Sequence, residues 1–156
     1  MFREMRRVKQ QISNEECITV LEEAPRGTMA VLGEDGYPYV FPMNHIYIDG
    51  KLYFHCAKTG HKLDAISENN KVSFCVMDTG YRNPGEWWWN IKSVIIFGTI
   101  RIVEDDATRD MAARQLGLKH YPTEESVDEL MRKHMQHLEV LELTIDHMTG
   151  KLVDES

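Results

Sequence analysis

Two Asp-Gly pairs, each standing between short apolar runs, constrain the fold of this chain more than any other feature. Asp35-Gly36 and Asp49-Gly50 favour tight two-residue turns, because glycine readily adopts the positive φ angles that such turns require. The runs that they separate are residues 28–32, 37–43, 45–48 and 51–56. This part of the chain is therefore predicted to be a meander of antiparallel strands.

Further strands are predicted at residues 71–77, 91–103 and 139–145. In the run 91–103, apolar residues occupy both faces of the first half, so this strand should lie in the centre of a sheet. Gly98 falls in the middle of the same run. A glycine there indicates a bulge or bend of the kind that lets a sheet curl into a barrel.

Four helices are predicted among the strands. Ser13 and Glu16 have the spacing of a capping box for residues 13–24, and short helices are expected at 61–68 and at 105–116, the latter closed by Gly117. Thr123 begins a fourth helix, whose apolar residues recur at helical spacing. The length of 156 residues suits one domain, residues 1–156. The predicted fold is mainly β with helices: an antiparallel, Greek-key-like barrel with peripheral helices.

The charge of the chain limits its partners. A net charge of -7 argues against nucleic acid and anionic membranes, because binding to a polyanion needs a basic stripe. Arg3, Arg6, Arg7 and Lys9 are read as a solvated arm, with a nucleic-acid arm as the alternative. No apolar run is long enough to span a bilayer or to act as a signal peptide, so a cytoplasmic location is expected. The three cysteines lack zinc-site spacing and are expected to be reduced.

The stretch from His55 to Lys62 has the outline of a local anion site. It runs from a predicted strand end through Gly60 into a predicted helix start. The exposed N–H groups of a first helical turn, the helix dipole and the basic side chains of His61 and Lys62 are what a phosphate monoester needs. The alternative is an ordinary surface helix that begins with basic residues.

Two other segments contain candidate site residues. At the junction of two predicted strands, Asn44 could hydrogen-bond a polar ring edge and His45 could face a ligand; the alternative is a turn with His45 in a core or surface role. Trp87, Trp88 and Trp89 cannot all point inward from one element. Their loop is predicted either to cover a planar cofactor or to pack in a dimer.

Signatures of other catalytic classes are missing from the sequence. It contains no GxSxG elbow, no P-loop, no GxGxxG and no HExxH. His134 and His137 lie near two methionines, but no acidic residue or cysteine stands in register with them. No metal site is therefore predicted.

Taken in order, the motifs closely resemble the nitroimidazole-resistance branch of the pyridoxamine 5'-phosphate oxidase-like flavoproteins. The resemblance covers nearly the whole chain. Its motifs lie at residues 6–7, 27–32, 36–40, 42–44, 49–57, 60–62, 72–76, 93–98 and 147–151.

The resemblance implies an FMN-binding split barrel, usually a homodimer with each FMN in a groove between the subunits. The phosphate would then lie on Gly60, His61 and Lys62. The residues that would line the ribityl chain and the isoalloxazine are Met43, Asn44, His55, Cys56 and Ala57. The partner subunit would complete the site with Ser93 and with Trp88 or Trp89.

The same resemblance implies an FMN-dependent oxidoreductase that reduces a small aromatic or nitro compound with NADH or NADPH as the electron donor. The flavin would carry the hydride, and His45 is a candidate proton donor to the reduced ligand. Two alternatives remain open. One is an FMN-binding electron carrier or flavin-storage protein without a dedicated substrate. The other is a split barrel that binds haem or a deazaflavin, with His55 and His61 as ligands.

Overall fold

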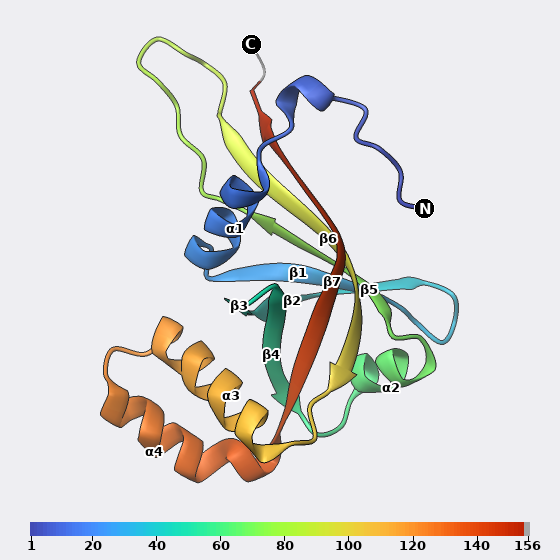
Figure 1. Ribbon diagram of the computed structural model, residues 1–156, viewed down its shortest axis with the longest axis vertical. Helices are drawn as coiled ribbons and strands as arrows, with labels where there is room; N and C mark the ends of the chain where they lie inside the picture. The colour runs from blue at the N-terminus through green and yellow to red at the C-terminus, as the bar shows by residue number, and fades with distance from the viewer. Residues whose placement is uncertain (155–156) are drawn as a thin grey trace.

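The computed structural model describes residues 1–154 (Figure 1). One seven-stranded antiparallel sheet has the order β2-β1-β5-β6-β7-β4-β3. The strands are β1 (Arg26–Leu32), β2 (Pro38–Asn44), β3 (Ile46–Ile48), β4 (Lys51–Ala57), β5 (Lys71–Met77), β6 (Ile91–Ile102) and β7 (Leu138–Val153). The helices are α1 (Asn14–Glu23), α2 (His61–Glu68), α3 (Asp106–His120) and α4 (Glu124–His134), with short 3₁₀ turns at Val8–Gln10 and Met135–His137.

The two edge strands of the sheet, β2 and β3, are joined in the chain by a single residue, His45. The sheet must therefore curl until β2 comes close to β4, the strand next to β3 at the other edge. Within residues 1–154 no hydrogen-bonded ladder joins β2 to β3 or β4. The barrel is closed by the chain and not by strand pairing, which confirms the prediction of a split antiparallel barrel with peripheral helices.

The predicted turns and the predicted bend are confirmed. Asp49 and Gly50 have φ angles of 47° and 82°, and Gly36 has a φ of 81°, so both Asp-Gly turns use the left-handed region. The register between β6 and β7 shifts between Phe97 and Gly98. A Cβ atom on Gly98 would lie 2.4 Å from the carbonyl oxygen of Thr144, so glycine is what allows β7 to cross so closely.

The closing strand is longer than predicted. β7 continues past Ile145 to Val153 and pairs with the first half of β6. The prediction ended at residue 145 because the residues that follow are mostly polar or glycine. Gly150 has a packing role instead: a Cβ there would lie 2.5 Å from Cys17 Sγ, so the glycine lets α1 lie directly against β7.

The third helix also runs further than predicted. α3 passes through Gly117 and ends at His120, and Tyr121 is extended at φ -113° and ψ 149°. Pro122 explains this end, since the residue before a proline disfavours helical geometry. Gly117 does not end the helix. It lets α4 approach, because a Cβ on it would lie 2.8 Å from Val127 Cγ1.

The helices cover different parts of the barrel. Cys17, Val20 and Leu21 of α1 pack into the main core, which also contains Phe54 and Phe74. α3 and α4 form a helical pair beside β3 and β4, whereas α2 follows β4 directly and lies apart from that pair (Figure 1). No helix among residues 1–154 has the length and hydrophobicity needed to cross a bilayer.

Candidate functional site

Residues from β2, β4 and α2 meet at the split edge of the barrel. Lys62 Nζ lies 3.7 Å from Met43 Sδ and 4.7 Å from the centre of the Phe41 ring. The His61 ring stacks on Tyr39, with 4.1 Å between the ring centres. The first turn of α2 is thereby held against alternate side chains of β2. The structure brings together three of the predicted segments, at residues 43–44, 55–57 and 60–62.

The start of α2 differs from the starts of the other helices. Side chains of Ser13, Asp105 and Thr123 cap α1, α3 and α4 by accepting a backbone hydrogen bond. α2 begins at Gly60, which has a φ of 140° and no side chain to act as a cap. Its first N–H groups are therefore not engaged by a capping side chain, and they are available to an anion.

Lys62 adds a cation at this position. Its amino group contacts a thioether sulfur and an aromatic face, and no carboxylate among residues 1–154 forms an ion pair with it. Lys62 is half-buried, so part of its side chain is fixed by packing. A fixed, unpaired ammonium beside an uncapped helix start suits a phosphate group.

An open pocket of about 460 Å³ continues from Met43 along the edge of the barrel. It is lined by Arg26, Pro42, Met43, Asn44 and His55. Arg26 donates from Nε to Oδ1 of Asn44 at 3.2 Å, which fixes the amide so that its NH₂ group remains free to donate. Burial of the ring lowers the pKa of His55, although one side of it remains open to solvent. The polar groups of this pocket are therefore mainly hydrogen-bond donors.

The other predicted residues of β4 have alternating orientations. Cys56 is buried in the main core, and desolvation raises the pKa of its thiol. Its neighbours His55 and Ala57 are exposed on the opposite face of the strand. Cys56 can therefore reach a ligand at this site through its backbone, whereas His55 and Ala57 can also use their side chains.

His45 is not placed to donate a proton to a ligand, contrary to its predicted role. Its side chain is fully buried, and its Nε2 lies 2.7 Å from the carbonyl oxygen of Leu21. Burial, followed by the positive charge of Lys119, lowers the pKa of His45 to about 4. The residue is the corner at which the chain passes from β2 to β3, and its ring packs edge-on against Phe74.

The predicted partner residues lie elsewhere in the chain. Ser93 is at the start of β6, and the tryptophan loop precedes it, at the end of the molecule opposite α2 (Figure 1). Trp87 and Trp89 are exposed, and Trp88 is half-buried with its ring edge-on to that of Trp87. Within one chain these residues are separate from the α2 site.

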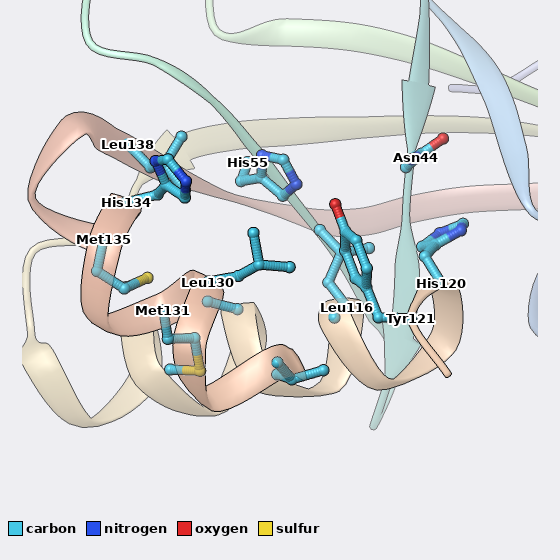
Figure 2. A pocket seen from close by; sticks show the side chains of 13 residues that line it. Asn44, His55, Leu116, His120, Tyr121, Leu130, Met131, His134, Met135 and Leu138 are labelled. Atoms are coloured by element: carbon cyan, nitrogen blue, oxygen red, sulfur yellow. The ribbon is translucent and has the colours of Figure 1, made fainter. Parts of the chain in front are cut away.

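A second pocket, of about 260 Å³, was not predicted from the sequence. It lies between the α3–α4 pair and the barrel, and Asn44 and His55 line it as well (Figure 2). The spacing of apolar residues after Thr123 predicted the helix α4. That spacing could not indicate that the apolar face of the helix borders a cavity. Within residues 1–154, no three His, Cys, Asp or Glu side chains are grouped closely enough to hold a metal ion.

Comparison with solved structures identifies proteins of the same fold. A protein from Bacteroides thetaiotaomicron described as a 5-nitroimidazole antibiotic resistance protein superimposes with a TM-score of 0.78 at 20% identity, covering 92% of this chain and 87% of that chain. An FAD-binding protein from Mesorhizobium loti gives 0.69 at 23% identity, with 92% and 97% covered. The FAD and heme binding protein from Mycobacterium smegmatis gives 0.70 at 24% identity, with 94% and 74% covered.

Sequence comparison extends this result from fold to family. No curated protein matches the chain. A family model described as pyridoxamine 5'-phosphate oxidase matches residues 13–152, which include every strand of the sheet except the last residue of β7. The chain therefore belongs to the pyridoxamine 5'-phosphate oxidase family.

Proposed function

We propose that this protein binds FMN at the interface of a homodimer and reduces a small aromatic or nitro compound with electrons from NADH or NADPH. The observation that carries the proposal is the start of α2, where Gly60 leaves the first N–H groups uncapped beside the unpaired ammonium of Lys62. In this account the FMN phosphate occupies that position, with His61 at its side.

The flavin ring is proposed to lie along the open pocket that continues from Met43 to Asn44 and His55. The oxygens and ring nitrogens of an isoalloxazine accept hydrogen bonds, and the Asn44 amide and the His55 ring can donate them. A bound flavin would supply hydride transfer. The protein's own contribution is to hold the ring edge, through an Asn44 side chain that Arg26 already orients.

The outer face of the sheet supports the proposed homodimer. Met77 of β5 and Ile95 and Phe97 of β6 are exposed on neighbouring strands, and Val40 is exposed on β2, two strands from β5. The pairing of β5 with β6 sets Cys75 directly beside Ile95. An apolar surface of this kind on a sheet is typical of an interface. Ser93 belongs to the same face, since it alternates with Val94 and precedes Ile95 by two residues. We infer that the partner subunit brings Ser93 and a Trp88 or Trp89 side chain to the flavin.

The relatives support a flavin more generally. The M. loti protein is described as FAD-binding, and the M. smegmatis protein as binding FAD and heme. FMN is preferred here because the site that we describe ends in a single anion position at α2. Release of the flavin by denaturation, followed by chromatography, distinguishes FMN from FAD, and a Soret band in the native spectrum would reveal haem.

A substitution tests the phosphate position. Lys62→Ala is expected to weaken FMN binding about tenfold or more, because loss of a charge-assisted contact costs about 1.5–3 kcal/mol. Lys133→Ala removes an exposed lysine of α4, away from the start of α2, and should leave the affinity unchanged. Titration of each flavin-free variant with FMN, followed by fluorescence quenching, measures both. Equal affinities for Lys62→Ala and the wild type would contradict the phosphate assignment.

Turnover separates an enzyme from a carrier. The proposed oxidoreductase should be bleached by NADH or NADPH under argon, and its flavin spectrum should return when a nitro-aromatic compound is added. A flavin-loaded protein that neither nicotinamide reduces would favour the alternative of an electron carrier or flavin-storage protein.

A further inference from the structure

The pocket between α3, α4 and the barrel has an apolar body. Its walls include Leu116 of α3 and Val127, Leu130, Met131 and Met135 on one side of α4 and the turn that follows it. Figure 2 shows Leu130 near the middle of the lining, with Met131 and Met135 on one side and Leu116 on the other. Of these five, only Leu116 and Val127 are fully buried. The apolar face of α4 is therefore only partly covered by protein.

The volume of the pocket limits what it can hold. An apolar cavity of about 150 Å³ is large enough to bind benzene, and pockets for drug-sized ligands begin at about 300 Å³. At about 260 Å³, this pocket suits one aromatic ring with a small substituent. Leucine and methionine side chains are well matched to a flat apolar ring, because methionine adapts its shape and contacts aromatic groups favourably.

Three of the polar side chains that line the pocket, Asn44, His55 and His120, lie toward one end, whereas His134 lies at the opposite end (Figure 2). Asn44 and His120 lie near each other at the right of the view in Figure 2, and His55 stands at the top, between them and His134. Asn44 and His55 also line the open pocket at the barrel edge, so the two pockets adjoin at these residues. The Nε2 atom of His120 is buried and has no hydrogen-bond partner among residues 1–154. This end of the pocket has unused hydrogen-bonding capacity.

The charges around the polar end are positive. None of the 13 residues that line the pocket is acidic. Burial lowers the pKa of His120, and the nearby positive charges of Lys119 and Arg26 lower it further. Lys119 is held in place next to this end because its Nζ donates to the carbonyl oxygens of Ala24 at 2.7 Å and His45 at 3.0 Å. An anionic group would be favoured here over a neutral or cationic one.

We propose that the α3–α4 pocket binds a single-ring aromatic carboxylate. The ring lies among the leucine and methionine side chains, and the carboxylate lies at the end formed by Asn44, His55 and His120. Binding at this pocket does not require a flavin. Only the further step, that the bound carboxylate is the substrate or lies next to it, rests on the proposed function, because Asn44 and His55 are the residues that the two pockets share.

Calorimetric titration of the purified protein with benzoate, benzyl alcohol and benzylamine tests the proposal. These probes have one ring each and differ in charge at neutral pH. Benzoate is expected to bind most tightly, and protonated benzylamine should not bind measurably. Binding of benzylamine as tight as that of benzoate, or no binding of benzoate, would overturn the assignment of the ligand class. The flavin content of the same samples is read from their absorbance, so failure of the flavin proposal is seen separately.

A pair of variants on α4 tests the location. Leu130→Trp places a large ring in the cavity and is expected to weaken benzoate binding about tenfold or more, because a filled interior leaves no room for a second ring. Arg132→Trp adds the same side chain at an exposed position two residues away and should bind benzoate like the wild type. Circular dichroism spectra of both variants serve as the control for folding. Unchanged binding by a folded Leu130→Trp variant would exclude this pocket as the benzoate site.

Discussion

At the scale of single residues, His45 shows how strongly position in the fold can override local sequence. Its neighbours Met43 and Asn44 line the open pocket, but its own ring points into the core. The partner that fixes it, the carbonyl of Leu21, is 24 residues away in the sequence. A short motif contains no information about such a contact, so the sequence could not distinguish a catalytic from a structural histidine here.

The buried state of His45 predicts a pH dependence of stability. The folded protein takes up this proton only near pH 4, whereas the unfolded chain takes it up near pH 6.5. Stability is therefore lost as the pH falls from about 6.5 to 4, by about 3 kcal/mol from this group. His55 and His120, whose pKa values are also lowered, act in the same direction.

His45→Gln removes the titration and retains a donor for the Leu21 carbonyl. Urea unfolding of the wild type and of this variant between about pH 7 and about pH 4, a range that spans the shift in pKa, measures the difference. The variant should lose less stability as the pH falls. Parallel pH profiles for the two proteins would contradict the assignment of His45 as a neutral core residue.

The proposed anion position at α2 shows the opposite case. Gly60, His61 and Lys62 were chosen as candidates from local signals, namely a glycine break followed by basic residues at a predicted helix start. The structure places a helix start there, and Gly60 has a φ angle that only glycine adopts easily. Features determined by a few consecutive residues could thus be predicted from the sequence. The contact of Lys62 with Met43, on a separate strand, could not.

At the scale of elements, Lys119 connects three parts of the fold. Its amino group donates to the carbonyl oxygens of Leu21 at 3.4 Å, Ala24 at 2.7 Å and His45 at 3.0 Å. It thereby ties the end of α3 to the end of α1 and to the corner between β2 and β3. Burial lowers the pKa of Lys119 to about 8, as expected for an ammonium that is held mainly by carbonyl groups.

Lys119→Met should lower the free energy of unfolding by about 1–3 kcal/mol, because the carbonyl groups of Ala24 and His45 lose this donor, whereas that of Leu21 keeps its contact with the His45 ring. Lys133→Met is the matched control. Lys133 makes an exposed ion pair with Glu129 one turn away, and pairs of this kind contribute only about 0.3–0.5 kcal/mol. Chemical denaturation measures both variants. A Lys119→Met protein as stable as the control would show that the triple contact has little energetic weight.

Element boundaries were predicted less well than element types. The bulge at Gly98 was correctly predicted, because a glycine inside a β-rich run commonly marks a bulge or a close approach of two backbones. The ends of α3 and β7 were predicted wrongly, because Gly117 and the polar residues after Ile145 were taken to end these elements. Each serves a long-range contact instead, Gly117 with Val127 and Gly150 with Cys17.

At the scale of the whole molecule, the outer face of β5 and β6 is expected to be the dimer interface. Ile95 is 44% exposed near the middle of this face. Ile95→Arg should convert the dimer to monomers and also weaken FMN retention, because the proposed site takes residues from both subunits. Light scattering on the purified variant measures its mass.

Ile102→Arg provides the comparison on the same strand. Ile102 is similarly exposed, at 41%, but it lies at the far end of β6 and beyond the bulge. This variant should remain dimeric and retain its flavin. A monomeric wild type, or an Ile95→Arg protein that stays dimeric, would contradict the proposed interface.

The measurement that tests the central claim most directly is the absorbance spectrum of the purified wild-type protein, before and after incubation with FMN. The account predicts a yellow protein with the two visible bands of an oxidised flavin, and release of one FMN per chain on denaturation. A colourless protein that takes up neither FMN nor FAD would contradict the proposed flavin site at β2, β4 and α2.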